Sequence, residues 1–265
     1  MSLLTVENLS IDYHTRDGDL RVVDDISFHV NEAEIVGLVG ESGSGKSAVI
    51  HAVAGLPRNV IATSHGRVTI DGSDMLTAGH RELRALHGSR IGFVGQNPFG
   101  SLHPTLKIST QFHNVLKAHG KTSSRRESFE LATETLKLVG IREPERVLRG
   151  YANQLSGGMA QRVVIGIAAV LKPRFFIADE PTTALDPTVQ IQILEVLRGL
   201  RESLGMSILI VTHDLGVVAN YCDRMLVMRS GSLLEQGAVR DLFSDATHPY
   251  TRELLDVDAH EGGQL

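Results

Sequence analysis

Residues 40–47 constrain the fold of this chain more than any other segment. Their sequence, Gly-Glu-Ser-Gly-Ser-Gly-Lys-Ser, has the form G-x-x-x-x-G-K-[ST]. They follow a short, almost wholly apolar run at residues 35–39, and the residues after them place apolar side chains at helical spacing. A buried strand, a glycine-rich turn and a helix in this order form a phosphate-binding loop, or P-loop. The segment therefore predicts an α/β fold that binds a nucleotide.

The residue types in this segment suit a phosphate group. The glycines allow the backbone to bend so that its N–H groups converge on an anion at the positive end of the following helix. Lys46 is expected to reach the β- and γ-phosphates, and the Ser47 hydroxyl to ligate Mg²⁺. The other residues predicted to line the nucleotide are Gly40, Glu41, Ser42, Gly43, Ser44, Gly45 and Ala48. The alternative, a glycine-rich turn without a ligand, is disfavoured because a strand precedes the segment and a helix follows it.

Strand-like and helix-like segments alternate through most of the chain. Residues 1–35 alternate apolar and polar side chains, which predicts short antiparallel strands with a turn at residues 16–19. Further strands are expected at residues 35–39, 67–72, 91–95, 174–179, 207–211 and 225–228, and helices at residues 48–56, 158–171, 188–204 and 249–256. Pro57 is expected to end the first helix. Strands separated by helices indicate a mostly parallel sheet covered on both faces.

Residues 100–152 differ from this pattern. They are polar and compatible with helix, with a charged segment at residues 121–130 followed by an amphipathic run. We interpret them as a helical insertion. The predicted organisation is therefore a P-loop NTPase core at about 1–96 and 163–240, which includes an N-terminal antiparallel β subdomain. An inserted α-helical subdomain lies at about 97–162, and a short C-terminal extension at about 241–265.

Four polar side chains lie at the ends of predicted strands or just beyond them: Gln96, Asp179, Glu180 and His213. The carboxyl ends of parallel strands meet at one edge of a sheet, where α/β folds bind ligands. Asp179 is expected to hold Mg²⁺ through water, and Glu180 to orient or deprotonate the attacking water. His213 could contact a γ-phosphate, and Gln96 both Mg²⁺ and the attacking water. Taken alone, each residue has a simpler explanation. The two acids could belong to a solvated turn, His213 could be a hydrogen-bonded structural histidine, and a single glutamine after a strand would mean little.

A second glycine-rich helix start follows at residues 155–162, Leu-Ser-Gly-Gly-Met-Ala-Gln-Arg. Ser156 is typical of a helix N-cap, and Gly157 and Gly158 leave the amides of the first turn bare for an anion. The alternative is an ordinary capped helix. One nucleotide needs one cradle, so two such helix starts suggest that two copies share their nucleotides.

An aromatic residue before the P-loop could stack on adenine. Tyr13 and His14 are the candidates, although an aromatic side chain on a strand more often only packs.

Composition narrows the function classes. The net charge is −5, from 26 Lys and Arg against 31 Asp and Glu, which disfavours a nucleic-acid partner. Cys222 is the only cysteine, so an internal disulfide is excluded and a reducing compartment is favoured. No apolar run approaches the roughly 20 residues that span a bilayer. The chain is therefore expected to be cytosolic, and any membrane role would depend on a partner.

The motifs taken together resemble the nucleotide-binding subunit of ATP-binding cassette (ABC) transporters. They are the P-loop at 40–47, Gln96, the segment at 155–162, Ile-Ala-Asp-Glu-Pro-Thr-Thr-Ala-Leu-Asp at 177–186 and Val-Thr-His-Asp at 211–214. The resemblance covers nearly the whole chain. It implies ATP and Mg²⁺ as ligands, with Ser47, Gln96 and Asp179 near the metal and Gln96, Glu180 and His213 as catalytic residues.

The resemblance also implies a head-to-tail dimer. ATP would lie between the P-loop of one subunit and the second glycine-rich helix start, residues 155–162, of the other. We call this segment the signature helix start. The signature residues toward the partner's ATP are Leu155, Ser156, Gly157, Gly158 and Gln161. Asp186 matches the loop that crosses between the two sites, the D-loop.

Three further segments are similar to importers of dipeptides, oligopeptides, and nickel or metal–metallophore complexes. They are residues 96–104, residues 181–186 and the His-Pro-Tyr-Thr (HPYT) sequence at 248–251. His103 departs from the asparagine common in that group, and Ala160 from a longer polar or basic residue. The chain also stops soon after the HPYT sequence, which leans toward the nickel branch.

The implied function is an ATPase subunit that drives such an importer from the cytoplasmic face of a prokaryotic inner membrane. The implied partners are a second ATPase subunit, two membrane-spanning permease subunits and an extracytoplasmic substrate-binding protein. The second ATPase is expected to be a related but different chain, with a homodimer as the alternative. Two other function classes stay open: a soluble ATPase of the superfamily that acts on DNA or the ribosome, and an export ATPase. A nucleic-acid partner is not expected.

Overall fold

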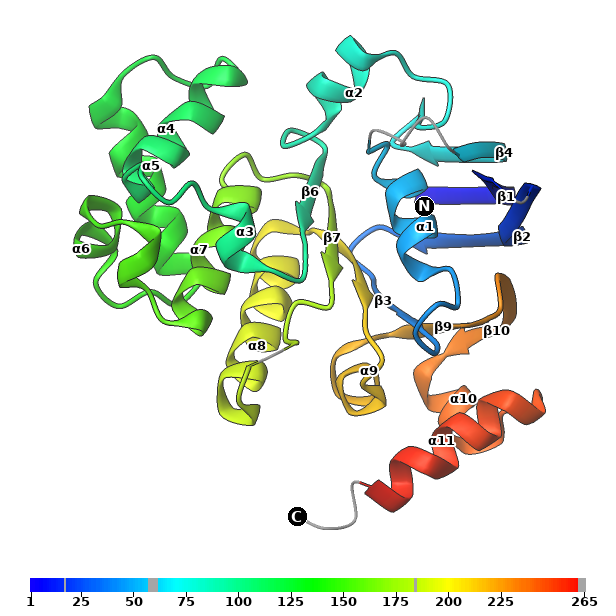
Figure 1. Cartoon of the computed structure of the whole chain (residues 1–265). Helices are drawn as coiled ribbons and strands as arrows, with labels where there is room; N and C mark the ends of the chain where they lie inside the picture. The colour runs from blue at the N-terminus through cyan, green and yellow to red at the C-terminus, as the bar shows by residue number, and fades with distance from the viewer. Residues whose placement is uncertain (17, 57–61, 184, 262–265) are drawn as a thin grey trace. The chain divides into compact units, whose positions relative to one another are not determined.

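A computed structural model describes residues 1–16, 18–56, 62–183 and 185–261, with the side chains described up to residue 256 (Figure 1). The chain forms two compact units. The first consists of Met1–Leu83 and Ser207–Leu265, and the second of Arg84–Met206. The second unit therefore takes in strands and helices that the sequence-based boundaries assign to the core. Those boundaries stay a prediction.

The first unit contains an antiparallel sheet with the strand order β2-β1-β4-β5. Its strands are β1 (Ser2–Thr15), β2 (Gly18–Asn31), β4 (Ala62–Ile70) and β5 (Ser73–Asp74). The antiparallel pairing predicted for residues 1–35 is confirmed, but β1 and β2 are long, at 14 residues each. The register between them shifts between Val6 and Leu9, next to Asn8 with φ 48°. Such a bulge keeps both apolar side chains buried on one face.

The second sheet in this unit has the order β10-β9-β3-β8. Its strands are β3 (Ile35–Val39), β8 (Ser207–Val211), β9 (Arg224–Arg229) and β10 (Ser232–Ala238). β3 is parallel to both β8 and β9, and β10 is antiparallel to β9. Every residue of β3 and β8 is buried, as continuous apolar runs predict for central parallel strands.

Four helices belong to the same unit: α1 (Lys46–Val53), α9 (Leu215–Tyr221), α10 (Val239–Asp245) and α11 (Pro249–Glu261). α1 ends earlier than predicted, because the chain turns at Gly55 with φ 58°. Pro57, which the sequence analysis makes the helix stop, lies outside the described residues. α2 (His80–Leu86) crosses the boundary between the units in sequence.

The second unit contains a parallel strand pair and a group of helices. Its elements are β6 (Ile91–Val94), α3 (Pro98–Ser101), α4 (Ile108–Ala118), α5 (Arg125–Leu138), α6 (Pro144–Arg149), a 3₁₀ turn at Ala152–Gln154, α7 (Gly157–Ala169), β7 (Phe175–Asp179) and α8 (Pro187–Leu204). The predicted helical character of residues 100–152 is confirmed. Phe112 and Leu136 meet at Gly166, where an added Cβ would lie 3.4 and 3.3 Å from them. Helices α4 and α5 therefore pack directly on α7.

None of the described helices combines the length and the hydropathy that a membrane span requires.

Candidate active site

The P-loop connects β3 to α1 and leaves the first turn of that helix open. Gly45 is the N-cap, with φ 103° and no side-chain cap. The N–H groups of the first turn therefore remain available for an anion. Lys46 is 8% exposed, and its Nζ donates to the backbone oxygens of Gly40 at 2.6 Å and Glu41 at 2.8 Å. These bonds hold the ammonium group against the loop.

Strand β9 and the turn after it support the loop from behind. Gly40 has φ 151°, and a Cβ there would lie 2.1 Å from the Met228 carbonyl oxygen. Only glycine fits this backbone contact. The Gly231 N–H donates to the Ser44 carbonyl oxygen at 3.0 Å, so the same segment contacts the loop a second time.

His213 lies at the same sheet edge as the P-loop. β8 and β3 are parallel neighbours, with Leu38 opposite Val211. His213 and Gly40 therefore both follow the carboxyl ends of adjacent strands. The His213 side chain is exposed, and Asp214 behind it caps α9 through Val217 N–H at 3.1 Å. The backbone that carries the histidine is thus anchored to a helix.

The second unit brings Gln96 and Glu180 together. Gln96 Nε2 donates to Glu180 Oε2 at 2.9 Å, and Thr183 Oγ1 donates to the same oxygen at 2.8 Å. Glu180 has φ 45°, a left-handed conformation that costs a bulky residue about 1–3 kcal/mol and clusters at functional sites. Asp179, the last residue of β7, is half-buried beside it.

Thr183 contacts the predicted catalytic residue Glu180, and it was not among the residues singled out from the sequence. The available signal was its place in the acidic turn, where a short polar side chain can reach back to the residue three positions before it.

The signature helix start has the predicted cap. Ser156 is exposed, and its Oγ accepts a long hydrogen bond of 3.4 Å from Met159 N–H. The two glycines differ. A Cβ at Gly158 would lie 2.4 Å from Cγ1 of Val189, whereas a Cβ at Gly157 would meet only Leu185 Cδ2, at an ordinary 3.5 Å. Gly158 is therefore required by packing on α8, and Gly157 is not.

The remaining signature residues, Leu155 and Gln161, are partly or fully buried, and the D-loop residue Asp186 caps a helix. Leu155 is half-buried, and Gln161 is only 1% exposed. The Nε2 of Gln161 has no hydrogen-bond partner among the described residues. Asp186 is exposed and caps α8, where its Oδ1 accepts from Val189 N–H at 3.0 Å.

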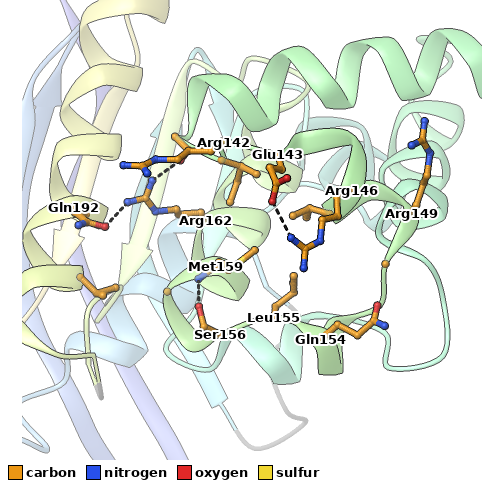
Figure 2. A pocket seen from close by; sticks show the side chains of 16 residues that line it. Arg142, Glu143, Arg146, Arg149, Gln154, Leu155, Ser156, Met159, Arg162 and Gln192 are labelled. Atoms are coloured by element: carbon orange, nitrogen blue, oxygen red, sulfur yellow. Dashed lines mark hydrogen bonds and ion pairs between the residues drawn. The ribbon is translucent and has the colours of Figure 1, made fainter.

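A cavity of about 800 Å³ opens beside Ser156 (Figure 2). Four arginines line it, Arg142, Arg146, Arg149 and Arg162, together with one glutamate, Glu143, to which Arg146 donates at 2.8 Å. Arg162 donates to the Gly140 carbonyl oxygen at 2.9 Å and to Gln192 Oε1 at 2.7 Å. Burial, and then the charge of Arg142, lower the pKa of Arg162. The signature helix start is thus flanked by positive charge, which the sequence analysis did not identify.

The two aromatic candidates for the base differ in their contacts. His14 is held through both ring nitrogens, by Asp19 at 2.6 Å and Thr63 at 2.7 Å. Tyr13 is 37% exposed, on β1 between Leu20 and Ala62. The structure therefore favours Tyr13 over His14 for stacking, and the stacking itself stays a prediction.

The predicted metal-binding residues suit Mg²⁺ chemically. Ser47, Gln96 and Asp179 all offer oxygen atoms, which this hard cation prefers. Among the described residues no group of three or more His, Cys, Asp or Glu side chains gathers around one point. Mg²⁺ commonly takes only one or two protein carboxylates and completes its shell with substrate phosphates and water.

Comparisons with known proteins agree with this geometry. The profile of a family described as ABC transporter matches residues 23–183, more than half of the chain. The probable peptide ABC transporter ATP-binding protein y4tR of Sinorhizobium fredii is 41% identical over 255 residues, which cover 96% of this chain and 76% of that protein. The oligopeptide transport ATP-binding protein OppD of Bacillus subtilis is 42% identical over 254 residues, covering 96% and 71%.

A solved structure extends the likeness to three dimensions. The ATP-binding cassette MJ0796, in a dimeric post-hydrolysis state bound to ADP and Pi, matches with a TM-score of 0.78 and 28% identity. The match covers 89% of this chain and 99% of that one. The predicted fold class, α/β with a P-loop NTPase core, is confirmed.

Proposed function

The chain belongs to the ABC transporter family, and on that premise we propose that it is the ATP-hydrolysing subunit of an importer that takes up peptides. The observation that carries the ATPase assignment is Glu180, held by Gln96 and Thr183 at the end of β7. The names of the relatives, which refer to peptides and oligopeptides, support peptides over nickel or metallophore complexes.

The first unit binds the phosphates of ATP. The open amides at the start of α1 and the Lys46 ammonium group surround the β- and γ-phosphates, and the exposed Ser47 hydroxyl faces the metal side. Ser47, Asp179 and Gln96 would hold Mg²⁺, which supplies neutralisation of phosphate charge when bound. Tyr13 offers its exposed ring to the base.

Glu180 then acts on the attacking water. Its two hydrogen-bond donors fix the orientation of the carboxylate, so the carboxylate can align a water molecule and accept its proton. His213 contacts the γ-phosphate from the end of β8. The left-handed backbone at Glu180 is strained, and such strain is common at catalytic turns.

The signature helix start acts on the nucleotide of a second ATPase subunit. The exposed Ser156 and the uncrowded Gly157 receive the γ-phosphate of that neighbour, with Asp186 at the crossing loop. The dimeric state of the MJ0796 cassette supports this arrangement. The second subunit is a related chain or a second copy of this one, and two permease subunits and an extracytoplasmic binding protein complete the importer at the cytoplasmic face of the prokaryotic membrane.

The decisive test is Glu180→Gln. Loss of the general base should lower the hydrolysis rate by about 10²-fold or more, while ATP binding and ATP-dependent dimerisation persist. Steady-state phosphate release and light scattering with Mg-ATP measure the two effects. Glu195→Gln is the matched control and should hydrolyse ATP at the native rate, since Glu195 is a partly exposed residue of α8 that pairs with Arg198. A native rate in Glu180→Gln would remove Glu180 from the mechanism.

The importer assignment has its own test. Affinity purification from membranes should recover permease subunits together with a peptide-binding protein. Recovery of DNA-bound or ribosome-bound chain instead would overturn it.

A further inference from the structure

The HPYT segment at residues 248–251 lies in the core that supports the P-loop, although the proposed hydrolysis does not use it. Tyr250, on α11, is only 3% exposed. It belongs to a cluster of buried residues made of Val39, Leu215, Val218, Met225, Val227, Val239, Leu242 and Tyr250. Val39 immediately precedes the P-loop, and Leu215 begins the helix that follows His213. The cluster therefore joins α11 to both functional segments of the first unit.

Arg229 connects Tyr250 to the loop backbone. Its guanidinium carbon lies 4.3 Å from the centroid of the Tyr250 ring, a cation–π contact. Arg229 lies between Met228, whose carbonyl oxygen closes against Gly40, and Gly231, which donates to Ser44. The tyrosine ring therefore holds the segment that contacts the P-loop at two places.

The hydroxyl group of Tyr250 contributes less than its ring. Burial, and then the neighbouring Glu41, raise the pKa of Tyr250, so the phenol remains neutral beside the P-loop glutamate. The oxygen is buried and has no partner in hydrogen-bond geometry among the described residues. The ring of Tyr250 and its contact with Arg229 are thus the parts that position residues 228–231.

The start of α11 is anchored independently. The Glu235 carboxylate accepts from Thr247 N–H at 2.7 Å, from the Thr247 hydroxyl at 2.7 Å and from His248 N–H at 3.2 Å. His248 Nδ1 in turn accepts from Tyr250 N–H at 3.1 Å. These bonds fix the backbone on which Tyr250 is carried, and α11 (red in Figure 1) packs against α9.

We propose that Tyr250 is a positioning residue for nucleotide binding. Through Arg229 and residues 228–231, its ring holds the P-loop backbone in the shape that receives phosphates. This inference rests on the proposed ATPase function, because it assigns the HPYT sequence a role in the same site.

The test compares three variants of the full chain: Tyr250→Leu, Tyr250→Phe and Leu255→Ala. Leu255 packs on the same cluster from the same helix without contacting Arg229 in any described interaction, and so serves as the control. Calorimetric titration measures the Kd for Mg-ATP well below the melting temperature, which is recorded separately. We expect Tyr250→Leu to weaken binding about three- to tenfold, as loss of a partly desolvated cation–π contact would. Tyr250→Phe should stay within about twofold of native. Leu255→Ala should lower the Tm and leave the Kd unchanged.

Arg229→Gln provides a second route that does not disturb the core, since Arg229 is exposed. It should weaken ATP binding as Tyr250→Leu does, and the double variant should be no weaker than either single one. Equal Kd values for Tyr250→Leu and the native chain, or the same loss in Leu255→Ala, would overturn the proposal. A native chain that binds no ATP would instead refute the proposed function, so the two failures are distinguishable.

Discussion

The two glycines of the signature helix start, Gly157 and Gly158, should respond oppositely to the same methyl group. Both lie in the first turn of α7. At Gly158 the new Cβ would lie 2.4 Å from Val189 Cγ1, far inside van der Waals contact. Forcing α7 and α8 apart there should cost about 1–3 kcal/mol. At Gly157 the Cβ would meet Leu185 Cδ2 at 3.5 Å, and alanine should be neutral or stabilise by up to about 1 kcal/mol.

Gly157→Ala should keep the stability of the fold but lose dimer-dependent hydrolysis. Gly157→Ala leaves the fold and the P-loop intact, so ATP binding by the isolated chain should be native. Its methyl group, however, would occupy the space where the neighbour's γ-phosphate approaches the amides after Ser156. Hydrolysis that depends on dimer formation should therefore fall to the background of the isolated chain.

Urea unfolding, ATP titration and hydrolysis as a function of protein concentration together check this contrast. The midpoint should fall for Gly158→Ala and hold or rise for Gly157→Ala, with unchanged slopes. Gly199→Ala, at a position where an added Cβ meets nothing within 4 Å, controls for the substitution itself. The reasoning fails if Gly157→Ala hydrolyses ATP like the native chain, or if it unfolds as early as Gly158→Ala.

Two further outcomes follow from single contacts. Thr183→Val removes one of the donors that orient Glu180, so kcat should fall about tenfold at unchanged ATP affinity. Thr183→Ser keeps the hydroxyl and should retain the native kcat. Equal kcat values in the two variants would contradict the role of the hydroxyl. Burial raises the pKa of Glu235, but the hydrogen bonds from Thr247 and His248 outweigh that effect and lower the pKa from 4.5 to about 2. A carboxyl group whose pKa is lower in the folded state stabilises the fold above its unfolded pKa, so this contribution is complete above about pH 5 and is lost as the pH falls toward 2. The melting temperature of Glu235→Gln should therefore depend less on pH in that window, and an identical dependence in both proteins would refute the assignment.

Local pattern determined much of the architecture. The strands at 35–39 and 207–211 match their predicted bounds, because continuous apolar runs have few ways to be buried. Short elements escaped prediction. α9 spans only Leu215–Tyr221, two turns of helix, too few for a periodic pattern to stand out. α10 and α2 were missed for the same reason.

The sequence by itself determined which residues suit which chemistry: the P-loop, the two acids at the end of the strand at 175–179, and the Ser156 helix start. These signals are local, since a cap, a glycine turn or a strand end is defined by neighbours along the chain. Only the tertiary structure decided that Thr183 and Gln96 share one oxygen of Glu180, that Val189 crowds Gly158, and that Arg229 carries the ring of Tyr250. Most of these pairs join residues far apart in the chain. Burial patterns show which face of an element is covered, whereas sheet order and packing decide what covers it.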